Sequence, residues 1–139
     1  MVHSEQTVSR LTPSDEAQMA KQRALLEVYL GDADSRKNYQ SAAGKLGLLR
    51  ALLQQEVFQA HQTYELQCMG IVLGDAFVQA WQLQWVMVED DYGRDPAVKL
   101  EGTTRILFPL TMISKRVERG EEVDVFELFN GVAEQLEQM

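Results

Sequence analysis

Four carboxylates lie close together in one short stretch, and this acidic cluster is the strongest candidate for chemistry in the sequence. In chain order they are Glu89, Asp90, Asp91 and Asp95. Calcium and magnesium prefer oxygen ligands of this kind. The spacing does not follow an EF-hand loop, which needs acids at alternate positions and a closing glutamate. It also departs from a restriction-type nuclease core, because Ala97 stands where an acid would have to precede Lys99.

Three interpretations of this cluster therefore remain open. Asp90 and Asp95 can accept hydrogen bonds from turn amides or pair with Arg94, which makes the segment a structural or solvated turn. The same turn, together with Tyr92, can form an edge that binds a partner protein. A metal site is the least favoured of the three.

A basic helix face is the second candidate, formed by Lys115, Arg116 and Arg119. Basic side chains near the end of a helix interact favourably with its negative pole, which gives them a structural role. The alternative is a surface that binds an anionic group or orients a partner. A pocket is a further hypothesis, and it requires that Asp75, from a helix, meet Glu89, Asp90 and Arg116.

The usual nucleophiles and metal ligands are sparse. Cys68 is the single cysteine, so it can form neither an internal disulfide nor a cysteine-based zinc site. His3 and His61 have no histidine or cysteine at ligand spacing. No nucleophile elbow or phosphate-binding glycine loop is present. We therefore predict no bound metal and no cofactor. The sequence favours a protein that is not an enzyme.

Charge and length limit the class of protein. The chain has 139 residues, enough for one domain, and a net charge of −8. Residues 81–139 hold twelve acids and six bases, a net −6. This charge disfavours nucleic acids and favours a basic protein partner, or simply solubility. Residues 1–10 lack the apolar stretch of a signal peptide, and no run approaches the ~18 apolar residues of a membrane span. We expect a cytoplasmic protein.

The pattern of apolar residues predicts helices on both sides of a short set of strands. A first helix follows Thr12 and Pro13 and stops at Gly31, and a second helical region with a break near Gly44 covers 35–58. The segment 62–81 is apolar on two sides and predicts a buried central helix. Two more helices follow Pro109 and Asp124 and are separated at Gly120.

Strand signals occupy residues 83–88, 97–100 and 105–108, with a polar turn segment at 89–96. Connections this short favour antiparallel pairing. The predicted fold is α+β: a small antiparallel three-stranded sheet packed against a helical layer, in the order α-α-α-β-β-β-α-α. Residues 1–10 are expected to be a disordered N-terminus. Residues 11–139 form a single domain, with an N-terminal helical part at 11–60 and a core at 61–139.

Several strings in the second half carry a family resemblance. They lie at 64–67, 70–75, 85–90, 92–97 and 108–118, and the last reads Phe-Pro-Leu-Thr-Met-Ile-Ser-Lys-Arg-Val-Glu. Together they resemble the bacterial family catalogued as domain of unknown function 3806. The resemblance implies a small bacterial domain without an agreed activity, so it assigns no catalytic residue.

Three functions are compatible with these observations. The first is a non-enzymatic interaction domain that uses the 89–95 turn and the 115–119 face, for example an immunity or inhibitor protein that masks a basic toxin. The second is an enzyme or small-molecule binder with the pocket described above. The third is a structural subunit that forms a homodimer through the exposed side of the sheet.

Overall fold

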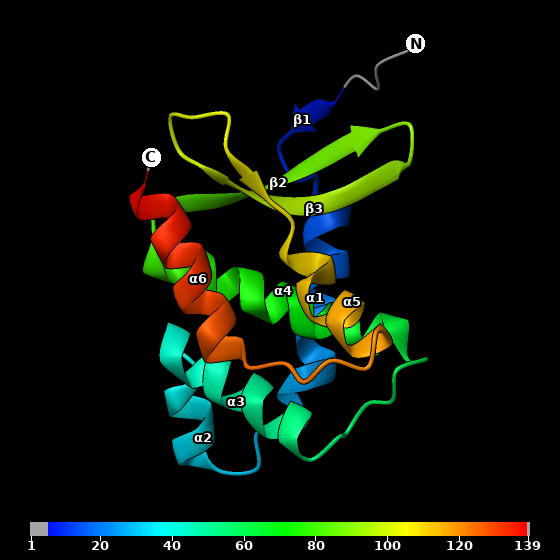
Figure 1. Ribbon diagram of the computed structural model, residues 1–139, viewed down its shortest axis with the longest axis vertical. Helices are drawn as coiled ribbons and strands as arrows, with labels where there is room; N and C mark the ends of the chain where they lie inside the picture. The colour runs from blue at the N-terminus through cyan, green and yellow to red at the C-terminus, as the bar shows by residue number, and fades with distance from the viewer. Residues whose placement is uncertain (1–5, 139) are drawn as a thin grey trace.

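The computed structural model describes residues 6–138, and over these residues the chain forms a sheet on one side and a layer of helices on the other (Figure 1). In order the elements are β1 (Thr7–Ser9), α1 (Pro13–Glu27), α2 (Ala33–Asn38), α3 (Ala42–Gln54), α4 (Thr63–Ala80), β2 (Leu83–Asp90), β3 (Gly93–Leu100), β4 (Ile106–Leu107), the 3-10 turn η1 (Pro109–Thr111), α5 (Met112–Glu118) and α6 (Val125–Glu137). The α+β class is confirmed. No helix among the described residues is long and apolar enough to cross a membrane.

The sheet has four strands in the order β1-β2-β3-β4, all antiparallel, so the prediction of three strands is wrong by one. The extra strand is β1, in which Thr7 pairs with Glu89 and Ser9 with Met87. It lies in the stretch expected to be disordered, and a short polar segment carries no strand pattern of its own. Pairing with the otherwise open edge of β2 satisfies its backbone groups. Residues 1–5, and with them His3, lie outside the described part of the chain.

The segment 89–96 is not a polar turn, as the sequence suggested, but the end of a long hairpin. Asp90 pairs with Gly93, and only Asp91 and Tyr92 form the turn between β2 and β3. Gly93 has φ +140°, a conformation that side-chain-bearing residues rarely adopt. Glu89 faces Arg94 across the two strands, and this pairing of opposite charges helps to extend the ladder.

Helix α4 is the buried centre of the molecule, as its two apolar sides predicted. It packs against α1, α3, α5 and η1. Gly70 allows this close approach, because a Cβ at that position would lie 2.6 Å from the carbonyl oxygen of Pro109. Gly74 allows the indole of Trp85 to pack against the helix, because a Cβ at this position would overlap the indole ring. The two glycines therefore set the distance between α4 and the segment formed by η1 and Trp85, since both lie next to Pro109.

The helix ends follow the local signals with two exceptions. Thr12 caps α1 by exchanging hydrogen bonds with Asp15, and Asp124 caps α6. Gly120 ends α5 with φ +76°, as predicted. Helix α1, however, stops at Glu27 rather than at Gly31, and the region 35–58 is two helices joined at residues 39–41.

Candidate functional site

Asp75 forms a structural bridge between three elements. Its carboxylate on α4 accepts hydrogen bonds from Arg23 of α1, with Nε–Oδ2 at 2.7 Å and Nη2–Oδ1 at 2.9 Å. It also accepts the Trp85 Nε1–H bond from β2 at 2.9 Å. The side chains of Arg23 and Asp75 are only 30% and 14% exposed. The hydrogen bonds to Asp75 raise the pKa of Arg23 above its ordinary value, because they outweigh burial, which lowers it. Asp75 therefore holds α1 and the sheet against α4.

The tip of the hairpin is tied to α1 by a second ion pair. Arg94 donates to both carboxylate oxygens of Asp15, at 2.6 and 2.7 Å. These bonds, and the one from the Thr12 amide, lower the pKa of Asp15 far below its usual value. Asp90 accepts a hydrogen bond from the Tyr92 amide at 2.8 Å, as the structural interpretation of the turn predicted. Tyr92 itself is 93% exposed. Glu89 and Asp91 lie on the same hairpin.

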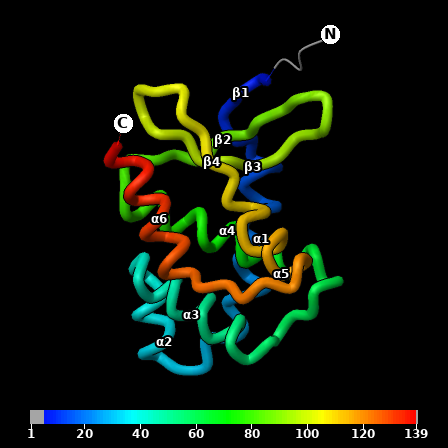
Figure 2. The backbone as a smooth tube through the Cα atoms, viewed as in Figure 1, coloured from blue at the N-terminus to red at the C-terminus, as the bar shows by residue number. Residues whose placement is uncertain are grey.

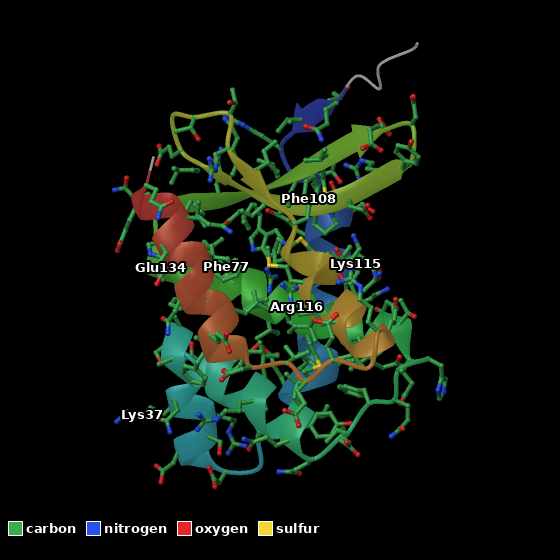
Figure 3. All side chains as sticks on the ribbon, viewed as in Figure 1. Lys37, Phe77, Phe108, Lys115, Arg116 and Glu134 are labelled. Carbon is green, nitrogen blue, oxygen red and sulfur yellow. The ribbon has the colours of Figure 1, made fainter. Side chains whose placement is uncertain are left out.

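The three residues of the basic helix face have different surroundings. Lys115 is exposed on the outer side of α5, whereas Arg116 lies toward the other helices and donates to the Met112 carbonyl at 2.7 Å (Figure 3). Arg119 pairs with Glu121 at 3.5 Å. The three residues do not form one uniform cationic surface.

The structure does not bring together the four side chains of the predicted acidic and basic pocket. Asp75 is bound to Arg23 and Trp85, Glu89 and Asp90 lie near the tip of the hairpin, and Arg116 lies on α5. None of the four lines either of the two cavities described below. The geometry gives the pocket hypothesis no support.

The outer side of the sheet is already partly covered. Trp85 contacts α4, so the alternation of a strand places Val86 and Val88 on the opposite side. There they form a small cluster with Ala97 and Ile106 in which Val86, Val88 and Ala97 are buried. A homodimer through this side would find little of that cluster exposed.

A large groove lies elsewhere, where the end of α3 and the 55–60 loop face the segment between α5 and α6. It has a volume of about 880 Å³. Five carboxylates line it, against the single guanidinium of Arg50: Glu56, Glu121, Glu122, Asp124 and Glu127. Most of the remaining lining is apolar, and Gln54 and Gln59 add uncharged polar groups. The large apolar side chains are Leu52, Leu53, Phe58, Leu66, Met69, Val117 and Val123. The groove therefore combines an apolar surface with a concentration of negative charge.

Sequence reasoning did not identify this groove. The sequence indicated Asp124 only as the residue at the start of a helix, and Asp124 does cap that helix. The available signal was the run of acids at 121, 122, 124 and 127, interrupted by valines. Glu56 contributes from the far side of the groove, in a backbone conformation with φ +49° that joins α3 to the loop. Its place beside the others depends on the packing of α3 against α6.

The remaining candidates for chemistry are inert in this fold. Cys68 is fully buried on α4, and burial raises the pKa of its thiol to about 11. At neutral pH it stays a protonated thiol, which is a poor nucleophile. Within residues 6–138 no group of three or more histidine, cysteine or carboxylate side chains is arranged to hold a metal ion.

Comparison with known proteins gives a family and a fold. Residues 45–129 match the family described as domain of unknown function, DUF3806. A crystal structure of a protein from Bacteroides thetaiotaomicron VPI-5482 has a similar fold, with a TM-score of 0.76 and 12% sequence identity over 96% of this chain. The chain spans 49% of the length of that protein. No curated protein shows significant sequence similarity. Since the family match covers more than half of the chain, this protein belongs to the DUF3806 family.

Proposed function

We propose that this protein is a non-enzymatic interaction domain whose acidic groove binds a basic, amphipathic segment of a partner protein. The observation that carries the proposal is the composition of the groove, which is lined by five carboxylates together with several apolar side chains. One of these carboxylates, that of Glu121, also forms an ion pair with Arg119. Asp124 is occupied in part by the amides of the α6 start.

The two properties of the groove have separate effects on binding. Burial of apolar side chains against residues such as Leu53 and Phe58 supplies most of the affinity. The carboxylates attract a cationic partner from a distance and repel acidic ones, so they act mainly on the association rate and on specificity. The chain as a whole is acidic, with a net charge of −8, and this adds to the steering. A partner segment with lysines or arginines on one face and leucines on the other fits both properties.

An immunity or inhibitor protein that masks a basic toxin is a specific form of this proposal. A cytoplasmic location would be consistent with it. The acidic groove supports a basic partner of this kind, because a toxin that acts on nucleic acid carries a cationic surface that a carboxylate-lined groove can cover.

A pair of designed peptides tests the proposal directly. A fluorescent amphipathic Lys/Leu peptide of about 18 residues, five helical turns, is titrated with the protein, and its anisotropy gives the affinity. A Lys/Ser peptide of the same charge and a Glu/Leu peptide of opposite charge serve as controls. The Lys/Leu peptide should bind most tightly, with an association rate that falls as salt is added.

Two double variants then locate the site. Glu121→Lys with Glu122→Lys should weaken binding of the Lys/Leu peptide by about tenfold or more, because two attractive charges become repulsive. The matched control, Asp90→Lys with Asp91→Lys, makes the same change of charge on the hairpin and should weaken binding much less. The opposite pattern would make the hairpin the binding edge and refute the groove as the site.

A further inference from the structure

A second cavity lies on another part of the molecule, between α1, α4 and the β2–β3 hairpin. Figure 1 shows α1, in blue, beneath this hairpin. The cavity has a volume of about 330 Å³ and shares no lining residue with the acidic groove. This is at the lower end of the range for small-molecule sites, ~300–1,000 Å³.

Gln22 is the most informative residue of the lining. It belongs to α1 and is only 7% exposed, and it lines the cavity. Within the described chain its carboxamide makes no side-chain hydrogen bond to another residue. Buried polar groups in folded proteins nearly always have a partner. Gln22 is not among the fully buried atoms that lack a partner, so its carboxamide can be reached from the cavity that it lines and is available to bond to a molecule there.

Other uncharged hydrogen-bonding groups surround Gln22. Gln18 from α1 and Gln67 and Tyr64 from α4 line the same cavity. Gln18 Nε2 lies 3.4 Å from the Tyr64 hydroxyl, in a long hydrogen bond. Each carboxamide offers both a donor and an acceptor, and so does the phenol. The lining therefore presents alternating donors and acceptors rather than charges of one sign.

The charged residues of the lining do not favour an anion. Arg94 donates from both of its terminal nitrogens to the carboxylate of Asp15, so its charge is already balanced by this ion pair. Asp95 adds a carboxylate that can accept hydrogen bonds. Met19, Met87, Pro96 and Leu110 supply apolar surface. Hydroxyl groups match such a lining best, since each can donate to a carbonyl or carboxylate oxygen while it accepts from an amide.

We infer that this cavity binds a neutral, polyhydroxylated small molecule of about the size of one sugar ring, with Gln22 as the central hydrogen-bonding residue. The inference is independent of the proposed function, because the two cavities have no residue in common. Apolar faces of such a ligand would pack on Met19 and Leu110, and its hydroxyls would face the glutamines.

Saturation-transfer NMR with defined probes tests this inference. The probes are the methyl glycosides of glucose, galactose and mannose, the corresponding free sugars, and the open-chain polyol sorbitol. Glucuronate and glucosamine serve as charged counterparts. At least one neutral glycoside should bind, and glucuronate should bind more weakly than its neutral parent. Binding of sorbitol or of the free sugar alone would identify a free metabolite as the source, whereas binding of methyl glycosides indicates a glycan end.

The variant Gln22→Met keeps the length and volume of the side chain but removes its hydrogen bonds. The substitution should lower the affinity for the tightest-binding probe by about tenfold or more, because a site that hydrogen-bonds a hydroxyl group loses that bond. Gln135→Met, on the exposed side of α6, is the matched control and should bind like the parent protein. If Gln22→Met does not fold, as judged by thermal melting, Gln67→Met makes the same test from α4. The inference would be overturned if the Gln22→Met variant, or Gln67→Met in its place, bound the probe as tightly as the parent protein. It would also be overturned if no neutral probe bound to the parent protein.

Discussion

Asp75 shows at the scale of a single residue how a candidate for chemistry becomes part of the framework. Its three hydrogen bonds join Arg23, which is 52 positions away in the sequence, to Trp85. Three of the roughly four acceptor sites of this carboxylate are therefore used within the protein itself. A carboxylate used in this way stabilises the packing of α1 on α4, and its loss should affect folding rather than binding.

The variant Asp75→Asn tests this structural role. The new amide can still accept from Trp85 but cannot form the bidentate ion pair with Arg23. We expect the free energy of unfolding to fall by about 2 kcal/mol, because a partly buried guanidinium loses its partner. Urea denaturation gives this value. Replacing both partners, as in Arg23→Met with Asp75→Leu, should recover part of the loss. A single variant as stable as the parent would show that the bridge does not hold α1.

At the scale of elements, the glycines of α3 and α4 decide how closely the layers approach. Gly70 meets the backbone of Pro109 and Leu110, so α4 and η1 pack almost backbone to backbone. Gly47 on α3 is also in a helix, but nothing lies within 4 Å of the place where its Cβ would be. The two residues are alike in sequence context and opposite in packing.

This contrast gives a matched pair of substitutions. Gly70→Ala should destabilise the protein by about 2 kcal/mol or more, because the methyl group would force η1 away from α4. Gly47→Ala should stabilise it by about 0.5–1 kcal/mol, since alanine costs less backbone entropy in a helix. Thermal melting followed by circular dichroism measures both. A neutral Gly70→Ala would mean that η1 can shift without cost.

Local features were predictable from the sequence and distant ones were not. The Thr12 and Asp124 caps depend on hydrogen bonds to residues two or three positions away, so they can be predicted from the local sequence. The bond from Arg94 to Asp15 spans 79 positions, and nothing at either end identifies the other. The same holds for Gln22, which becomes significant only because the hairpin and α4 close a cavity over it. Prediction of the acidic groove would have required the relative positions of α3 and α6 as well as the run of acids.

At the scale of the whole molecule, β1 closes one edge of the sheet and lies at the upper end of the view, far from α2 and α3 (Figure 2). An exposed strand edge is a template for pairing with another chain. β1 covers the edge of β2 with only three residues. Coverage of this edge of the sheet therefore depends on a very short segment.

Deletion of the chain through Ser9 should expose this edge and promote self-association. Sedimentation velocity should show a higher average mass for the shortened protein than for the full chain at equal concentration. Val8→Thr keeps a β-branched residue in the strand and is the control, which should behave as the parent does. A shortened protein with the mass and melting temperature of the parent would show that β1 does not protect the edge.

The pairing of Thr7 with Glu89 also has a consequence for biosynthesis. During translation β1 leaves the ribosome before β2, and the four helices α1 to α4 are made between the two strands. These nascent helices can therefore fold while β1 is still without its partner strand. The edge of the sheet that β1 closes is completed only after the helices have been made.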